Sequence, residues 1–159
     1  MTNQDGFHPD LTSAGDANPQ KTRTRVHHVR TSDLSSGTAQ TTGMQRFAAL
    51  SGASVGSEKI WMGETHVSPD TASDNHHHGE SETAIFVQSG HPEFVFHDGV
   101  GEVRIATAPG DYVFVPPYVP HREENPDPDN PAVVVIARST QEAIVVNIPA
   151  LYALPDESA

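Results

Sequence analysis

The sequence predicts an all-β domain, folded as an antiparallel barrel or a jelly-roll sandwich. Short runs of β-branched and aromatic residues follow one another closely through the second half of the 159-residue chain. Pairs such as Ser89-Gly90, Asp98-Gly99 and Pro109-Gly110 separate these runs, and no stretch shows a sustained amphipathic helical pattern. Short strands spaced in this way bury a core by closing into a barrel or by packing as two sheets.

The length of the chain allows one domain with polar ends. Residues 1–24 are rich in Asn, Asp, Gly, Pro, Thr and Ser and lack apolar periodicity, which predicts a disordered N-terminal arm. We expect the single domain to span residues 25–150, and residues 151–159 to form a short C-terminal tail.

Charge and composition narrow the range of partners. The 21 acidic residues outnumber the nine Lys and Arg residues and give a formal net charge of -12, which repels nucleic acid and anionic membrane surfaces. No apolar run approaches the roughly 18 residues of a membrane span, and no secretory leader is evident. The chain has no cysteine, which fits a cytoplasmic, reducing compartment and excludes thiolate nucleophiles and thiolate metal ligands.

The expected strands follow the apolar patterns in chain order. Residues 26–29 begin a first strand, and residues 44–50 form a short strand or one helical turn between glycines that break longer elements. Residues 59–67 form a strand that places Trp61 in the core. Asp98-Gly99 predicts a hairpin, and three prolines make residues 125–131 an exposed loop. The remaining expected strands are 76–78, 84–87, 93–97, 102–106, 111–115, 119–124, 132–137 and 143–148.

The strongest chemical signal is a pair of histidines with one residue between them. Side chains alternate along a strand, so His76 and His78 point the same way, close enough to share one ion, whereas His77 points away. Glu82 follows after a short turn, and His121 lies in a Pro-rich segment further on. Three imidazoles and a carboxylate form a site suited to zinc, iron, manganese, nickel or copper.

These two segments resemble the paired motifs of the cupin superfamily. The first family pattern is His-x-His, then Glu, then Gly, and residues 76–90 match it with His76, His78, Glu82 and Gly90. The second pattern is Gly, Pro-x-Gly, His and Asn at fixed intervals, and residues 110–125 match it with Gly110, Pro116, His121 and Asn125. The resemblance covers about residues 55–148. Over this stretch the sequence is similar to small single-domain bacterial cupins.

The resemblance implies a fold, a ligand set and an assembly. It implies a cupin double-stranded β-helix, which is a jelly-roll barrel, holding one divalent metal through His76, His78, Glu82 and His121. It also implies a homodimer. Because the superfamily includes dioxygenases, isomerases, lyases, binding proteins and zinc cupins that join two nitrogens, the fold alone does not select a reaction.

The chain departs from the family pattern at two positions. Seven residues separate Glu82 from Gly90, whereas Thr83 has the commoner spacing, and a shift of one residue turns a side chain to the other face of the strand. A bulge between residues 79 and 81 would direct Glu82 inward, and without it the site has three histidines. Tyr118 replaces the usual Gly, and since Tyr tolerates a positive φ poorly, we expect a different turn type before His121.

A metal with open coordination positions inside an apolar barrel favours a metal-dependent enzyme, dioxygenase-like, acting on a small organic molecule. The alternatives are a non-catalytic module that binds or senses a small metabolite, a zinc cupin with Lewis-acid chemistry, and a barrel whose metal only stabilises the fold. If Glu82 is not a ligand, it is a possible acid or base. Gln45 and Arg46, beside Gly43, could reach a ligand, and Gln88, Arg104 and Arg138 are candidates for polar anchoring, with a structural or solvated role as the alternative.

Overall fold

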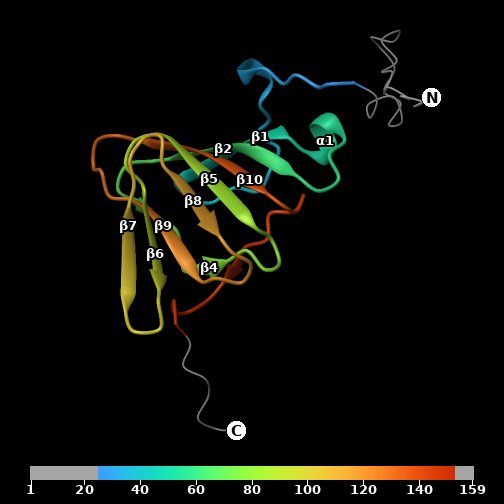
Figure 1. The fold of residues 1–159 in the computed structure, drawn as a ribbon. Helices are drawn as coiled ribbons and strands as arrows, with labels where there is room; N and C mark the ends of the chain where they lie inside the picture. The colour runs from blue at the N-terminus through green and yellow to red at the C-terminus, as the bar shows by residue number, and fades with distance from the viewer. Residues whose placement is uncertain (1–24, 153–159) are drawn as a thin grey trace, which may run out of the picture.

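The computed structural model describes residues 25–152, so the predicted arm and residues 153–159 of the predicted tail lie outside it. Two antiparallel sheets pack face to face (Figure 1). One has the order β1-β2-β10-β5-β8, and the other has the order β11-β4-β9-β6-β7 with β3 also paired to β9. This jelly-roll arrangement confirms the predicted all-β fold. The strands are β1 (Met44–Leu50), β2 (Trp61–Val67), β3 (Thr71–Ala72), β4 (His76–His77), β5 (Thr83–Ser89), β6 (Glu93–His97), β7 (Glu102–Ala106), β8 (Tyr112–Val115), β9 (His121–Asn125), β10 (Ala132–Arg138) and β11 (Val146–Asn147).

The core lies between the two sheets. Alternate residues of β2, β5 and β10 point inward, as the two-residue period of a strand requires. Trp61 is 3% exposed, which confirms the prediction that it belongs to the core. The main core cluster comprises Ala48, Trp61, Ile85, Val87, Phe94, Val115, Val134 and Ile136.

The predicted hairpin at Asp98-Gly99 is confirmed, because β6 pairs antiparallel with β7 across it. Asp98 Oδ1 accepts hydrogen bonds from the backbone N–H groups of Val100 (2.8 Å) and Gly101 (3.0 Å). Gly99 has a φ of 96°, a conformation that glycine adopts without a steric penalty.

One N-terminal element differs from the prediction, and for a second the structure decides between the two predicted alternatives. Residues 26–29 form no strand, and Val26 is 96% exposed, so no neighbouring strand is available to pair with this segment. Residues 44–50 form a full strand, β1, since β2 offers a pairing edge. The other elements before β2 are a 3-10 turn, η2 (Thr31–Asp33), and one helical turn, α1 (Gly52–Val55).

The short helix α1 was not expected among small residues and glycines. Ser51 caps it, accepting a hydrogen bond from the Ser54 N–H, while the Ser54 hydroxyl accepts one from the Ser51 N–H. Gly56 ends it in the left-handed conformation. Within residues 25–152, no helix is long and apolar enough to cross a membrane.

Gly63 allows β1 and β2 to approach closely. A Cβ at this position would lie 2.2 Å from the Phe47 carbonyl oxygen, and a backbone atom cannot move aside cheaply. We expect Gly63→Ala to lower the free energy of unfolding by roughly 1–3 kcal/mol in urea denaturation. Gly101→Ala is the control, because nothing lies within 4 Å of its Cβ position. Equal stability of the two variants would contradict this close packing.

Candidate metal centre

Two neighbouring strands bring three histidines together. His76 on β4 is the direct cross-strand partner of His121 on β9, and their ring centroids are 4.5 Å apart. His78, which follows β4, has its ring 4.9 Å from that of His76 and 4.8 Å from that of His121. The structure therefore places all three predicted histidines in one cluster.

A fourth side chain, Glu123, completes the cluster. It lies two residues after His121 on β9 and so shares its face, with Oε1 3.8 Å from His121 Nε2. One ligand atom from each of His76, His78, His121 and Glu123 lies within 4.8 Å of all the others. Sequence reasoning did not single out Glu123, although its spacing from His121 repeats that of the histidine pair.

Each histidine ring is held by a hydrogen bond from Nδ1 to a backbone carbonyl. His76 donates to Asp74 (2.8 Å), His78 to Ile144 (2.9 Å) and His121 to Val119 (3.0 Å). A carbonyl oxygen only accepts, so Nδ1 carries the proton in each ring and Nε2 keeps its lone pair. Hydrogen bonds of this kind, from the ring nitrogen that faces away from the metal, orient metal-binding histidines in proteins.

The Nε2 atoms of His78 and His121 are buried and have no hydrogen-bond partner among the described residues. Buried polar atoms are normally paired, and leaving one unpaired costs about 1–3 kcal/mol. Nitrogen lone pairs beside a carboxylate are the donor set that divalent transition metals prefer. The residues of this cluster thus fit a metal ion.

Burial also fixes the charge of two of the imidazoles. Desolvation lowers the pKa of His78 to about 4, and it lowers the pKa of His121 as well. Both rings are therefore neutral at pH 7, the form that coordinates metals.

The structure does not bring Glu82 into the cluster, which corrects its predicted position. Residues 78–81 form a turn, closed by a hydrogen bond from the Ser81 N–H to the His78 carbonyl (3.0 Å), with Gly79 at a φ of 54°. The following strand places Thr83 inward, 3% exposed, and Glu82 outward in solvent. Backbone hydrogen bonds of Glu82 to Ser139 hold this register, so no bulge directs its carboxylate inward.

Tyr118 also differs from the expectation. It adopts a φ of 62°, so the turn before His121 keeps the left-handed residue despite the loss of the usual Gly. The Tyr118 N–H donates to the Gly79 carbonyl (2.7 Å), and its ring lies 5.9 Å from that of His77. This contact ties the Pro-rich segment to the turn that follows the histidine pair.

Four other histidines lie outside the cluster. His77 accepts a hydrogen bond from the Gly79 N–H at Nδ1, and His66 contacts Glu64 at 3.0 Å. His91 contacts the Thr107 carbonyl, and His97 stacks on Tyr152 with ring centroids 4.5 Å apart.

Three cavities are lined by residues of the cluster. One of about 30 Å³ is bounded by His78 and Glu123, and another of about 330 Å³ is bounded by His76. The third, of about 420 Å³, is bounded by His121 and has mainly apolar walls. Its lining residues are Phe94, Phe96, His97, Ile105, Val113, Phe114, Val115, Pro116, Val119 and His121.

Solved structures share this fold at low sequence identity. The polyketide cyclase RemF from Streptomyces resistomycificus matches with a TM-score of 0.63 and 19% identity, over 84% of this chain and 89% of that one. Bacillus subtilis oxalate decarboxylase, described with Mn(II) centers, matches with a TM-score of 0.59 and 20% identity, over 70% of this chain but 29% of its own. A recombinant oxalate oxidase in complex with glycolate matches with a TM-score of 0.59 and 16% identity, over 70% of this chain and 58% of that one.

The family assignment comes from a match to the sequence. No curated protein matches the chain, and at the identities above the solved structures establish the fold alone. A family model described as a cupin domain matches residues 63–138, the segment that runs from β2 through both motifs to the end of β10. This match shows a cupin domain at residues 63–138, and the jelly-roll fold and the histidine cluster agree with it.

Proposed function

We propose that this protein is a metal-dependent enzyme that binds one divalent transition-metal ion through the cluster of His76, His78, His121 and Glu123. The observation that carries the proposal is the pair of buried, unpartnered Nε2 atoms on His78 and His121. A single cation would satisfy both atoms and would offset the charge of the buried Glu123 carboxylate, which is 8% exposed.

The protein side chains have defined roles at this site. The backbone carbonyls that accept from Nδ1 hold the three rings in place, so little ordering is needed when a ligand binds. A metal ion bound there supplies Lewis acidity, and iron, manganese, copper or nickel also supply redox chemistry with dioxygen. The mixed nitrogen and oxygen donor set accommodates each of these metals and zinc.

The apolar cavity beside His121 is the proposed place for the body of the substrate. Its volume of about 420 Å³ falls within the usual range for small-molecule sites, roughly 300–1,000 Å³. Phe94, Phe96 and Val115 from two strands of its wall exclude water from the reacting atoms. A small molecule with an apolar or aromatic body fits these walls better than a polymer does.

Two reaction classes follow, of which dioxygenase chemistry on a small enol or phenol is the first. The second is non-redox chemistry in which the metal acts only as a Lewis acid. It is supported by the donor set of three imidazoles and one carboxylate, which also accommodates zinc, a metal without redox chemistry.

The test is to measure the metal content of untagged protein, purified without added metal, by plasma mass spectrometry, followed by oxygen uptake with a panel of small enols and phenols. Near-stoichiometric iron, manganese, copper or nickel with substrate-dependent oxygen uptake supports the dioxygenase. Stoichiometric zinc with product formation and no oxygen uptake supports the Lewis-acid enzyme, and metal with binding but no turnover supports a sensing module. Failure to bind any divalent metal overturns the proposal. A homodimer and a cytoplasmic location stay predictions.

A further inference from the structure

Two arginines occupy inward-facing positions on the five-stranded sheet. Arg46 lies between Met44 and Ala48 on β1, both of which are buried, and Arg138 follows the buried Ile136 on β10 with the same alternation. Both arginines therefore share the sheet face that is turned toward the histidine-bearing sheet. Such positions normally hold apolar side chains, and a charge there calls for a partner.

Arg46 has unused hydrogen-bonding capacity. Its Nη1 donates to Thr41 Oγ1 (2.8 Å) and to the Ala39 carbonyl (3.4 Å), whereas Nε and Nη2 donate to no acceptor among the described residues. No ion pair joins it to a carboxylate in residues 25–152. The cross-strand partner of Arg46, Thr65, is fully buried and its hydroxyl also has no partner within that range.

Arg138 is held rigidly but is likewise without a counter-ion among the described residues. Its guanidinium carbon lies 4.0 Å from the centre of the Trp61 ring, a cation–π contact. Nε and Nη2 donate to the carbonyls of Thr140 and Gln141, both at 3.2 Å, which leaves Nη1 available. Burial and the positive charge of Arg46 lower the pKa of Arg138 to about 10, so the Arg138 guanidinium is charged at pH 7.

The two arginines lie beside the candidate metal centre. Arg46 and Arg138 line the cavity of about 30 Å³ together with His78 and Glu123. Arg46 also lines the cavity of about 330 Å³ that reaches His76. A small charged group placed in the first cavity would thus meet both guanidinium groups and the cluster, with the second cavity beside it.

The charges at this place do not balance within the residues that the structure describes. A divalent cation at the cluster would exceed the single charge of Glu123, so the metal would add to the positive charge of the two arginines. The chain as a whole has a net charge of -12, yet none of its described carboxylates pairs with Arg46 or Arg138. An anionic ligand would supply the negative charge that the described residues do not.

We propose that Arg46 and Arg138 bind a carboxylate group of the substrate next to the metal centre. This inference deepens the proposed function and rests on it for the metal. Guanidinium groups match a carboxylate with paired, charge-assisted hydrogen bonds, and the small cavity admits a group of only a few atoms. The substrate is accordingly a small carboxylic acid, so an enol or phenol that serves as substrate would also carry a carboxylate group.

The test is calorimetric titration of the metal-loaded protein with formate, malonate and benzoate, and with malonamide and benzamide as neutral counterparts. We expect the carboxylates to bind and the amides not to. Arg46→Gln and Arg138→Gln should each weaken carboxylate binding about tenfold or more. Arg138→Lys keeps the charge but replaces the planar guanidinium group. Its affinity for carboxylates should lie between those of Arg138→Gln and the unmodified protein.

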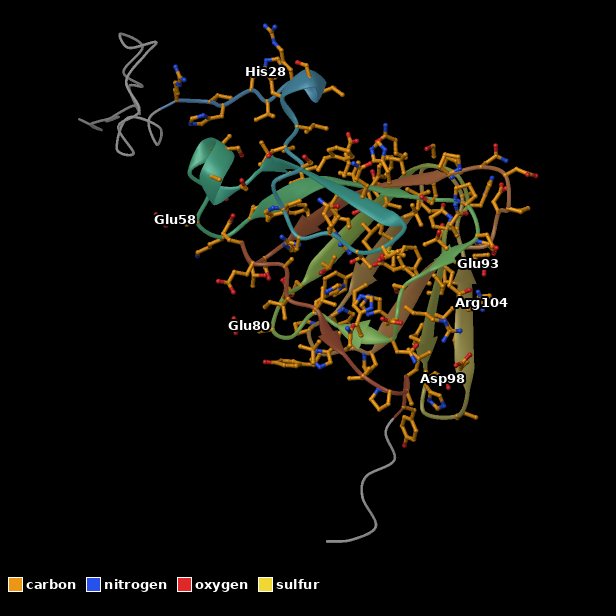
Figure 2. The ribbon with its side chains drawn as sticks, turned by 180° about the vertical axis from the view of Figure 1, so that it is seen from behind. His28, Glu58, Glu80, Glu93, Asp98 and Arg104 are labelled. Atoms are coloured by element: carbon orange, nitrogen blue, oxygen red, sulfur yellow. The ribbon has the colours of Figure 1, made fainter. Side chains whose placement is uncertain are left out.

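Arg104→Gln is the matched control. Figure 2 shows Arg104 beside Glu93, and its guanidinium also pairs with Glu124. Arg104 lines none of the three cavities that the cluster residues bound. This variant should change carboxylate binding less than twofold. Metal content is measured for every protein, and it should stay unchanged in all four variants.

The outcomes separate this inference from the proposed function. Metal retention with no carboxylate binding, or equal binding by the unmodified protein and the Arg46→Gln/Arg138→Gln double variant, overturns the arginine site alone. Carboxylate binding that depends on the arginines in a protein that takes up no metal supports the arginine site and overturns the metal enzyme.

Discussion

His121→Ala is expected to lower metal affinity by about 100-fold or more, enough to abolish stoichiometric metal after purification. His121 supplies one of the four donor atoms of the cluster, and loss even of a residue that only supports a ligand costs about 10–100-fold in metal affinity. Alanine removes the imidazole and, with it, one hydrogen bond to the fold, from Nδ1 to the Val119 carbonyl. Plasma mass spectrometry and competition with a chelating dye measure the effect.

The matched control for this substitution is His66→Ala. His66 lies on β2, contacts Glu64, and its side chain is 44% exposed, so its removal should leave metal content unchanged. Urea denaturation of the metal-free proteins separates loss of the site from loss of the fold. If metal-free His121→Ala folds normally and still binds metal as the unmodified protein does, the cluster is not the metal site.

Glu123→Gln is expected to lower metal affinity on the order of 100-fold, while Glu82→Gln leaves it within about twofold. Both substitutions remove one negative charge and keep the side-chain volume, so the two variants differ only in the position of the carboxylate that is lost. Glu123 is 8% exposed beside His121, whereas Glu82 is exposed outside the cluster. Equilibrium titration with Mn²⁺ and Zn²⁺ compares the two variants under the same conditions.

This pair of variants also tests the strand register. A loss of affinity in Glu82→Gln with none in Glu123→Gln would mean that the turn after His78 rearranges when metal binds and directs Glu82 inward. Equal losses would mean that both carboxylates serve the metal, and the four-residue cluster would then be incomplete.

The histidines of the site were predictable because their signals are local. The spacing of His76 and His78 is set by the period of one strand, and the second motif placed His121 at a fixed interval from Gly110 and Pro116. Strands 93–97 and 102–106 were also predicted with their observed bounds, since Asp98-Gly99 marks the turn between them.

The carboxylate was not predictable in the same way, because its position depends on distant pairing. Thr83 faces inward since β5 pairs with both β8 and β10, where Thr83 is opposite Val115 and Arg138. Sequence spacing near Gly79 does not contain this information. The alternation that pairs the two histidines also places Glu123 on the same face as His121. Acidic residues are common on strands, however, so without the fold nothing distinguishes Glu123 from the others.

Motif residues can also serve the fold rather than the site. Asn125, the last residue of the second motif, is 1% exposed and its side-chain amide donates to the carbonyls of Val67, Ser68 and Asn130. These hydrogen bonds hold the proline-rich loop at the end of β2. The arginines show the reverse case, because Arg46 and Arg138 belong to no motif and only the register places them beside the cluster.

The most direct test of the metal centre is anomalous diffraction from crystals of the protein grown with one equivalent of Mn²⁺ or Zn²⁺. We predict one strong anomalous peak per chain, bounded by the Nε2 atoms of His76, His78 and His121 and by a carboxylate oxygen of Glu123. A peak at any other place, or one bounded by Glu82 instead of Glu123, would contradict this assignment.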